Sequence, residues 1–203
     1  MIRAAILGAS GYTGFELVRL LSAHSEFEVT ALAGESKSGL PYASVYPSLE
    51  HLNLPQLCFA QDIDFEKVDV VIHCASHTNA QDSFSNENDM FENNISCIKN
   101  IISYCIKKKS KLIHISSSSV YGTSEKIMKE NIVKILKPQS PYAKIKLIEE
   151  RLLKSNKNKM KYISFRFGTI SGVSKGMRFH TAINKFCLSV SLNQKVEVYK
   201  TAI

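Results

Sequence analysis

The chain has 203 residues, enough for one sizeable domain or one domain and a part of another. Apolar residues make up 44% of it and charged residues 22%, the composition of a globular protein with a hydrophobic core. We expect neither a membrane span nor a signal peptide, because the apolar runs are short and glycines interrupt the first of them. The five cysteines show no CxxC pair and no metal-ligand spacing, so we expect free thiols in a reducing cytoplasm and no metal site.

The net charge of +8 is unevenly distributed. Residues 1–100 carry 5 basic and 13 acidic residues, whereas residues 101–203 carry 21 basic and 5 acidic residues. A basic segment can indicate nucleic-acid binding. No aromatic residues alternate with these lysines at base-stacking spacing, so we predict a solvated surface, with no nucleic-acid or membrane partner.

Predicted strands and helices alternate along the chain. Short apolar runs predict strands at 3–7, 27–33, 69–76, 111–117, 161–167 and 195–200. Apolar residues at helical spacing predict helices at 13–24, about 86–108, from Pro141 onward, and about 177–191. Glycines and prolines indicate loops over 35–55. The alternation predicts an α/β fold, a Rossmann-type doubly wound parallel sheet with helices on both faces.

The stretch "GASGYTG" places three glycines between the first strand and the first helix. Gly8 permits a tight turn, Gly11 lets backbone amides approach a pyrophosphate, and Gly14 lets the helix pack closely on the strand. The helix N-terminus adds N–H groups and a partial positive charge. Because the triplet stands between a predicted strand and a predicted helix, we interpret it as a phosphate-binding turn for NAD or NADP.

The choice between NAD and NADP stays open. Glu35 follows Gly14 by 21 residues, near where an acidic side chain would accept from the ribose 2′-hydroxyl of NAD. Ser36 and Lys37 could instead hold the 2′-phosphate of NADP, and all three could be plain turn residues.

The first third of the chain resembles one enzyme family closely. "MIRAAILGASGYTGFELVRLLSAHSEFEV", "GESKSGLPYASVYPSL" and "DFEKVDVV", within residues 1–72, are similar to the start of N-acetyl-gamma-glutamyl-phosphate reductase, an NADP-dependent enzyme of arginine biosynthesis. That family reacts through a cysteine that forms a thioester. No cysteine here stands in its Asn-Pro-Gly-Cys context, so this resemblance implies nucleotide binding without catalytic residues.

From about residue 70 the resemblance changes. "VDVVIHCAS", "ENNISCIKNII", "KLIHISSSSVYG", "PQSPYAKIKLIEERLL" and "FRFGTISGVSKGMRFH" are similar to extended short-chain dehydrogenase/reductases, the NAD-dependent epimerase/dehydratase family. We therefore predict one NAD(P)-binding Rossmann domain over 1–203, composite in sequence, with a reductase-like half at 1–72 and a dehydrogenase-like half at 73–203. Members of this family normally continue further, so we expect the substrate lobe to be largely missing.

The stretch "SPYAKIK" carries the predicted acid/base group. Ser140 can cap a helix and Pro141 can occupy its first turn. Tyr142 and Lys146 then lie one turn apart on one face. A phenol with a pKa near ~10 is a poor base at neutral pH, and a neighbouring ammonium favours the phenolate. The resemblance implies that Tyr142 moves the proton and that Lys146 holds the nicotinamide ribose; a solvated helix face is the bland alternative.

The family places its third catalytic group three residues before the Val of Val-Tyr-Gly, which is Ser117 here. Ser116 and Ser118 are the alternatives if the register differs by one, and a polar strand end capped by hydroxyls is the structural alternative. Dehydratases of the family carry Asp-Glu directly after this position. Ser118 and Ser119 stand there instead, which disfavours dehydration and leaves epimerisation or carbonyl reduction.

The resemblance also implies a set of cofactor contacts, in which an Asp-Ile pair touches adenine and the end of the predicted strand at 69–76 lies beside the dinucleotide. The predicted cofactor-binding residues are Gly8, Ser10, Gly11, Tyr12, Thr13, Gly14, Glu35, Ser36, Asp62, Ile63, Cys74, Ala75, Ser76, Tyr142 and Lys146. Asn94 matches a structural asparagine of the family. His73, His77 and His114 have no metal spacing, so we interpret them as satisfied, partly buried histidines.

The resemblance implies an NAD(P)-dependent epimerase or oxidoreductase that acts on a sugar-type hydroxyl or carbonyl, with a nucleotide sugar as substrate and a homodimer as an open option. Two alternatives stay open: a reductase-like NADP-binding domain of arginine biosynthesis, and a non-catalytic NAD(P)-binding module.

Overall fold

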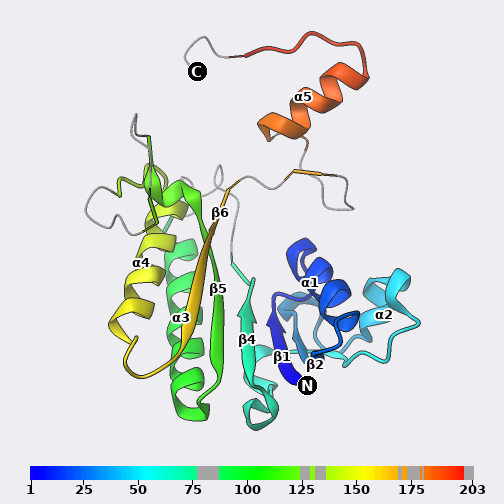
Figure 1. The fold of residues 1–203 in the computed structure, drawn as a ribbon, viewed down its shortest axis with the longest axis vertical. Helices are drawn as coiled ribbons and strands as arrows, with labels where there is room; N and C mark the ends of the chain where they lie inside the picture. The colour runs from blue at the N-terminus through cyan, green and yellow to red at the C-terminus, as the bar shows by residue number, and fades with distance from the viewer. Residues whose placement is uncertain are drawn as a thin grey trace. The chain divides into compact units, whose positions relative to one another are not determined.

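The computed structural model describes residues 1–76, 87–123, 129–130, 136–168, 171–172, 179 and 181–198. The chain divides into two compact units, Met1–Phe167 and Gly168–Ile203. In the first unit six strands form one sheet in the order β3-β2-β1-β4-β5-β6, and every neighbouring pair is parallel. The strands are β1 (Ile2–Leu7), β2 (Phe27–Ala33), β3 (Leu57–Cys58), β4 (Val70–His73), β5 (Lys111–Ser117) and β6 (Tyr162–Phe167) (Figure 1). The predicted α/β fold is confirmed.

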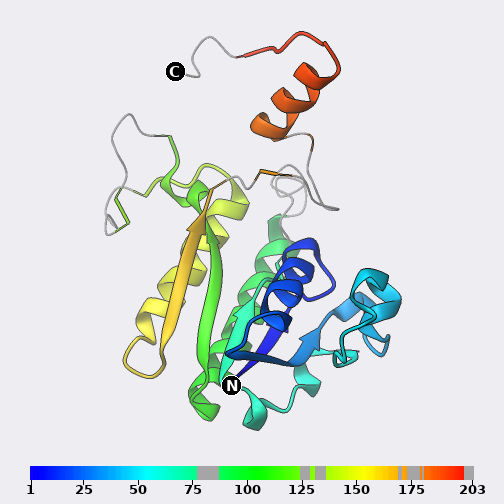
Figure 2. The ribbon, with the colours of Figure 1, turned by 45° about the vertical axis from the view of Figure 1, so that its right-hand side comes forward.

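Helices cover both faces of this sheet. Those of the first unit are α1 (Tyr12–Ser22), α2 (Tyr42–Val45), α3 (Glu87–Lys108) and α4 (Pro141–Ser155). Single turns of 3₁₀ helix are η1 (Glu35–Lys37), η2 (Pro47–Leu49), η3 (Ala60–Asp62), η4 (Phe65–Lys67) and η6 (Ser118–Tyr121). Helix α1 lies on one face, and α3 and α4 lie side by side on the other (Figures 1 and 2). The second unit contains α5 (Ala182–Ser191).

Successive side chains of β1 point to opposite faces of the sheet, which explains the separate hydrophobic clusters on the two faces. Ala5 and Leu7 join a buried cluster with Ile98 and Ile101 of α3. Ile6, which points to the other face, joins a separate buried cluster with residues of α1. Because both faces of β1 are covered, its sequence is apolar throughout, as expected of an interior parallel strand.

The predicted element boundaries hold well where the sequence pattern is strong. Strands β2 and β5 have the predicted limits, and α1, α3 and α4 differ from prediction by a residue or two within the described part of the chain. The sequence missed β3 and α2, whose two and four residues are too short to show a period. No described helix is long and apolar enough to cross a membrane.

The predicted strand at 195–200 is wrong over its described part. Residues 195–198 form no strand and are exposed; residues 199–200 lie outside the described residues. Val196 and Val198 alternate with charged residues, which resembles an edge strand. Alternation produces a strand only where a neighbour supplies hydrogen-bond partners, and no ladder of the described sheet includes this segment. The predicted helix at about 177–191 begins at Ala182 in the described residues.

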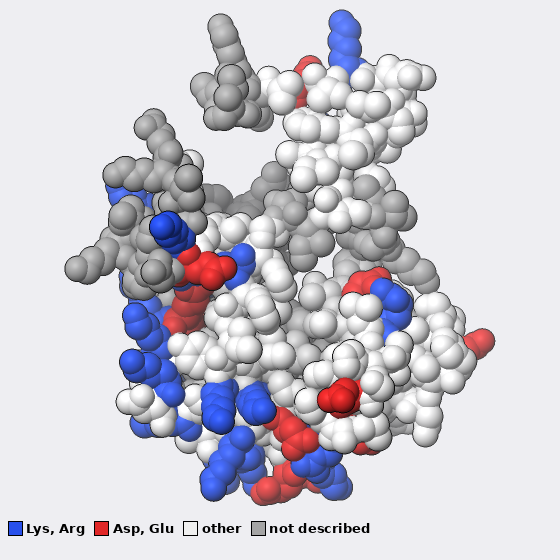
Figure 3. All heavy atoms as spheres, viewed as in Figure 1, with Lys and Arg blue, Asp and Glu red and all other residues white. Residues whose placement is uncertain are grey.

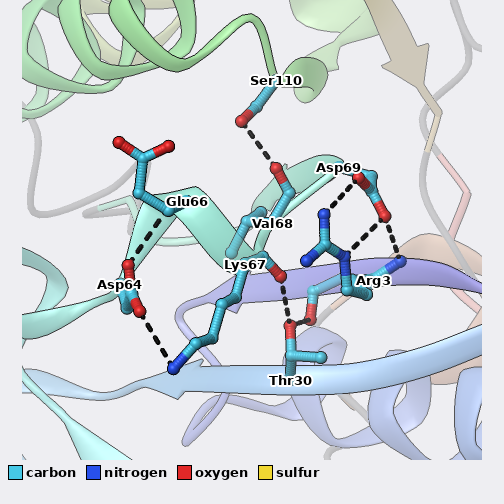
Figure 4. A network of polar contacts seen from close by, with 9 residues as sticks. Arg3, Thr30, Asp64, Glu66, Lys67, Val68, Asp69 and Ser110 are labelled. Atoms are coloured by element: carbon cyan, nitrogen blue, oxygen red, sulfur yellow. Dashed lines mark hydrogen bonds and ion pairs between the residues drawn. The ribbon is translucent and has the colours of Figure 1, made fainter.

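A polar network ties the amino-terminal ends of the strands together (Figure 4). Arg3 at the start of β1 makes a two-pronged ion pair with Asp69, with Nε to Oδ2 at 3.0 Å and Nη2 to Oδ1 at 2.8 Å. The backbone N–H of Arg3 also donates to Asp69, at 2.9 Å. Ser110, just before β5, donates to the carbonyl of Val68 at 2.8 Å. These contacts lie at the end of the sheet opposite the glycine turn.

The same end of the sheet carries much of the positive charge. Lys107 and Lys109 at the end of α3, and Lys157 and Lys159 after α4, are exposed. Figure 3 shows Lys and Arg gathered along the side of this face where α4 and the end of α3 lie. A groove of about 600 Å³ also opens at this end, beside the first residues of β2. Neither feature adjoins the glycine turn.

Candidate functional site

The glycine turn has the geometry that its sequence predicts. Gly8 has φ of +86°, and a Cβ at this residue would stand 2.6 Å from the backbone nitrogen of Ala75. A Cβ at Gly14 would stand 2.2 Å from the carbonyl oxygen of Gly8. At Gly11 the nearest atom to such a Cβ is again the Gly8 oxygen, at 3.4 Å, so that side of the turn is open. Gly8 therefore makes the turn and Gly14 the close packing, and Gly11 leaves room.

Helix α1 starts at Tyr12 with Gly11 as its N-cap, and no side chain caps it. Its first turn carries no acidic residue, and Tyr12 and Thr13 are exposed. The first N–H groups of a helix have no partner within the helix. An anion placed before this helix would meet free donors and the positive end of the helix dipole. The turn thus fits a pyrophosphate group, as the sequence predicts.

Two tyrosines that sequence analysis did not identify hold the turn in place. The hydroxyl of Tyr42 donates to the carbonyl of Ala9 at 3.0 Å, and that of Tyr46 donates to the carbonyl of Ser10 at 2.7 Å. Burial raises the pKa of both phenols, so both stay protonated donors. The two aromatics four residues apart in "PYASVYP" were the available signal, but nothing local shows that they reach back to the turn.

The residues predicted to recognise the adenosine ribose lie directly beside this turn. A Cβ at Gly34 would stand 2.8 Å from Ser10 Oγ, so the end of β2 touches the glycine turn. Glu35, Ser36 and Lys37 follow in η1 with their side chains exposed. These side chains could bind either the ribose 2′-hydroxyl of NAD or the 2′-phosphate of NADP, so the geometry leaves the choice of cofactor open.

The predicted adenine contacts differ in accessibility. Asp62 ends η3 and is exposed, whereas Ile63 is only 7% exposed. Ile63 packs in the core cluster on the α3 face, together with Ala33 and Ala75. Its side chain therefore supports the edge of the sheet more than it offers a contact surface.

The segment after β4 lies against the glycine turn. Cys74 donates from its backbone N–H to the carbonyl of Leu7 at 2.9 Å, and Ala75 is the residue that Gly8 approaches. Burial raises the pKa of the Cys74 thiol to about 12, so this cysteine is no ready nucleophile. Ser76 is half-buried.

Helix α4 begins as the sequence predicts. Ser140 is the N-cap, its Oγ accepts from the Ala143 N–H at 3.1 Å, and Pro141 occupies the first turn. Tyr142 is half-buried, and Lys146 is only 2% exposed. The ammonium of Lys146 lies 5.9 Å from the centroid of the Tyr142 ring. The pair therefore lies on a buried face of α4 and not on a solvated helix face, which was the alternative interpretation.

Ser117 stands at the carboxyl end of β5, where it caps η6 and is half-buried. Its Oγ accepts from the backbone N–H of Ser119 at 3.2 Å and from the Ser119 hydroxyl at 2.8 Å. Ser116 is buried and donates to Glu150 at 2.5 Å, so its hydroxyl is already engaged. Ser118, the other alternative, is half-buried at the start of η6. Ser117 and Ser118 are both half-buried, so the choice of Ser117 stays a prediction.

The structure separates the histidines that the sequence treated alike. His114 of β5 is fully buried and satisfied, with Nε2 at 2.7 Å from Glu149 Oε2 and Nδ1 at 2.8 Å from Ser164 Oγ. His73 of β4 is 2% exposed, and its Nδ1 has no hydrogen-bond partner among the described residues. His77 lies outside the described residues.

The position of His73 in the sheet explains its burial and its lowered pKa. It is the last residue of an interior strand and pairs in register with His114 of the next strand. Burial, reinforced by the nearby charges of Lys146 and His114, lowers the pKa of His73 to about 3, so the ring is neutral at physiological pH. Asn94 of α3 is also buried, at 3% exposure, in line with the structural role that the resemblance implies.

A partly buried ion pair lies one residue further along α4. Glu150 accepts from Arg166 of β6 at 2.9 and 2.6 Å and from Ser116 of β5. The guanidinium of Arg166 also lies over the Tyr121 ring, 4.9 Å from its centroid. Sequence analysis missed this group, because Glu149 and Glu150 are indistinguishable in sequence while their partners come from different strands.

Comparisons with known proteins support both resemblances. The chain is 50% identical over 80 residues to N-acetyl-gamma-glutamyl-phosphate reductase of Ruegeria pomeroyi, covering 39% of this chain and 23% of that protein. UDP-glucuronic acid 4-epimerase from Bacillus cereus superposes with a TM-score of 0.77 at 24% identity, over 98% of this chain and 66% of that one. UDP-N-acetylglucosamine 4-epimerase from Methanobrevibacter ruminantium gives a TM-score of 0.76 at 23% identity, over 98% and 65%.

These likenesses to solved structures show the fold, and the chain spans about two thirds of those epimerases and about a quarter of the reductase. The family description "NAD dependent epimerase/dehydratase family" matches residues 4–201, which includes the glycine turn as well as the region from residue 70 where the sequence suggested it. The chain belongs to the NAD dependent epimerase/dehydratase family.

Proposed function

We propose that this chain binds NAD or NADP over the glycine turn and assists epimerisation or oxidation–reduction at a hydroxyl or carbonyl of a nucleotide sugar. Family membership supports the reaction class. Solved relatives of the same fold include UDP-glucuronic acid 4-epimerase in complex with UDP-glucuronic acid and NAD. They also include UDP-N-acetylglucosamine 4-epimerase in complex with UDP-N-acetylmuramic acid. These ligands are the reason to expect a nucleotide sugar.

The residues at the carboxyl edge of the sheet fit a dinucleotide. Gly11 leaves open space before α1, whose first N–H groups would hold the pyrophosphate. Glu35 would accept from a ribose hydroxyl beside Ser10. This edge, between β1 and β4 where the strand order reverses, is where ligands of such sheets bind. When bound, the nicotinamide ring accepts or donates a hydride.

The chain's own residues would then handle the proton. Tyr142 would take the proton from a substrate hydroxyl as the phenolate and return it as the phenol. The ammonium of Lys146, 5.9 Å from the phenol ring, favours the phenolate. Ser117 would donate to the reacting oxygen from the end of β5. Dehydration stays disfavoured, because Ser118 and Ser119 stand where dehydratases of the family carry Asp and Glu.

The single observation that carries the proposal is the position of Lys146 beside Tyr142. Lys146 is 2% exposed, and its ammonium lies 5.9 Å from the centroid of the half-buried Tyr142 ring, close enough to favour the phenolate. The five cysteines are all free, which fits the cytoplasmic location that we also propose. The oligomeric state stays a prediction.

The test pairs cofactor binding with turnover. NAD and NADP are titrated separately against the purified chain by calorimetry, and a panel of UDP-sugars is then incubated with the better cofactor and analysed by chromatography. We expect Tyr142→Phe to keep cofactor affinity within about twofold and to lower turnover by at least about 100-fold. Equal turnover by wild type and variant would reject the catalytic assignment, and absence of binding for both cofactors would reject the whole proposal.

A second candidate, a reductase-like NADP-binding domain, rests on the 50% identity over 80 residues. Its chemistry needs a reactive thiol. Burial raises the pKa of Cys58, Cys74, Cys97 and Cys105, so none of these four is an activated nucleophile. A marked preference for NADP over NAD, with no turnover of any UDP-sugar, would favour this candidate or a non-catalytic binding module.

A further inference from the structure

A chain of buried polar groups runs from the sheet to the Tyr142–Lys146 pair. The ammonium of Lys146 lies 2.8 Å from Glu149 Oε2, and His114 Nε2 lies 2.7 Å from the same oxygen. His114 Nδ1 in turn contacts Ser164 Oγ at 2.8 Å. Glu149 and His114 are fully buried, and Lys146 is nearly so. Ser164 belongs to β6 and His114 to β5, so hydrogen bonds join these two strands to Glu149 of α4.

Glu149 is the negative centre of this group. Burial alone would raise its pKa, but the hydrogen bond from His114 and the charge of Lys146 outweigh burial and lower it. The carboxylate is therefore ionised and only accepts, so His114 must donate from Nε2. Its other oxygen, Oε1, is buried and has no hydrogen-bond partner among the described residues. One oxygen thus holds both donors.

The other titratable groups near this carboxylate supply no replacement for it. His73 of β4, with its ring centroid 6.1 Å from that of His114, is neutral because burial lowers its pKa to about 3. Burial keeps Cys97 of α3 and Cys74 after β4 as neutral thiols, with pKa values raised to about 11 and about 12. Tyr142 is a phenol on the same helix. Among the described groups here, Glu149 is the only one that can neutralise the Lys146 ammonium at neutral pH.

We propose that Glu149 is a positioning residue, which fixes the charged Lys146 side chain beneath Tyr142 and is itself held by His114 and Ser164. A lone ammonium in a buried position is costly, so it would lose its proton or move toward water. With Glu149 in place, Lys146 keeps its charge and its position. The role at Tyr142 rests on the proposed function, whereas the pairing itself does not.

Glu150 provides a matched control one residue away. It is likewise a glutamate of α4 in an ion pair, but it is partly buried and its partners are Arg166 and Ser116. Replacement of either glutamate by glutamine removes one negative charge from the same helix turn. Only Glu149→Gln removes the partner of Lys146. Any effect common to both variants therefore reflects general loosening of α4.

The first test needs no enzymatic activity. The folded protein is labelled with trace acetic anhydride at about pH 8, and peptide mass spectrometry gives the rate at Lys146 relative to the exposed Lys144. Only the neutral amine reacts, so loss of the paired carboxylate should raise the relative rate on the order of tenfold in Glu149→Gln. Glu149→Asp should restore most of the protection, and Glu150→Gln should stay within about twofold of wild type.

Two results would overturn the proposal: an unchanged Lys146 rate in folded Glu149→Gln, or an equal rise in both glutamine variants. If Glu149→Gln does not fold, His114→Leu replaces it, because leucine has no donor for Glu149 and loss of that donor should raise the rate to a smaller extent. An unchanged rate in folded His114→Leu would then refute the pairing.

The second test links the pairing to turnover of a UDP-sugar. Glu149→Gln should lower kcat more than it raises KM and move the alkaline limb of the kcat/KM profile to lower pH by about one unit, with recovery in Glu149→Asp. A uniform drop without a shift of that limb would reject the role at Tyr142. If the wild type neither binds cofactor nor turns over any sugar, the proposed function fails, while the labelling result still decides whether Glu149 holds Lys146.

Discussion

Mild acid should destabilise the first unit through His73. This residue is 2% exposed, lies on an interior strand and has a pKa lowered to about 3, first by burial and then by the charges of Lys146 and His114. In the unfolded chain a histidine titrates near ~6.5. Above that pH both states are neutral and His73 contributes its full stability. As the pH falls below ~6.5, His73 is protonated in the unfolded chain but not in the folded chain, so the free energy of unfolding decreases.

The size of the effect follows from this difference in pKa. Each pH unit below ~6.5 costs about 1.4 kcal/mol until the folded histidine titrates as well. At pH ~5 the free energy of unfolding should therefore be about 2 kcal/mol lower than at pH ~7 from His73 alone. Carboxylates whose pKa is lowered, such as Glu149, lose their contribution mainly below their ordinary range near ~4.3, so the window above pH ~5 isolates histidine.

The assay is urea unfolding, followed by far-ultraviolet circular dichroism at both pH values, for wild type, His73→Leu and His51→Gln. His51 is exposed and serves as the matched control. We expect His73→Leu to lose about 2 kcal/mol less than wild type on acidification, whatever its stability at neutral pH, and His51→Gln to behave as wild type. Parallel losses in wild type and His73→Leu would refute the reasoning.

Three further outcomes are expected. Gly14→Ala should lower the free energy of unfolding by about 1–3 kcal/mol, because its Cβ meets backbone atoms of the turn. Gly11→Ala should unfold like wild type but bind the dinucleotide more weakly. Urea titration measures the stability and calorimetry the binding, and equal stability of the two variants would contradict this reasoning. Asp69→Asn should lower the thermal midpoint at neutral pH and lower it progressively less as the pH falls below ~3.9, since Arg3 lowers the pKa of Asp69 and acid protonates the unfolded carboxylate before the folded one. Ser140→Ala should cost about 1 kcal/mol by loss of the N-cap bond, measured by urea unfolding, and an unchanged midpoint would argue against that bond.

Local signals were enough for most of the fold. Strands β2 and β5 were predicted with their observed limits, because continuous apolar runs bounded by polar residues have few other interpretations. The start of α4 followed from Ser140 and Pro141. The sequence could not predict β3, whose two residues are defined by pairing with Leu32 and Ala33, nor reject a strand at 195–198, where only the absence of pairing decides.

The candidate site likewise has some features that local sequence patterns predict and others that depend on tertiary contacts. The glycine turn and the Tyr142–Lys146 spacing are local patterns, so their geometry could be predicted. The reach of Tyr42 and Tyr46 to the turn could not, because it depends on how the segment after β2 folds back. The pairing of His114 with Glu149 likewise depends on which face of α4 meets β5.

The buried face of α4 shows why hydrophobic periodicity missed this cluster. Tyr142, Lys146, Glu149 and Leu153 follow one another at intervals of four, three and four residues, the spacing of a stripe that faces the core. Leu153 is fully buried in the apolar cluster on the α3 face, whereas Tyr142 is half-buried near the carboxyl edge of the sheet. A search for apolar residues at this spacing would place Lys146 and Glu149 in water, yet both are buried because each neutralises the other. Oppositely charged residues at the helical spacing of a buried face therefore indicate an ion pair in the interior. In this chain that pair, Lys146 and Glu149, lies beside Tyr142, the residue proposed to move the proton.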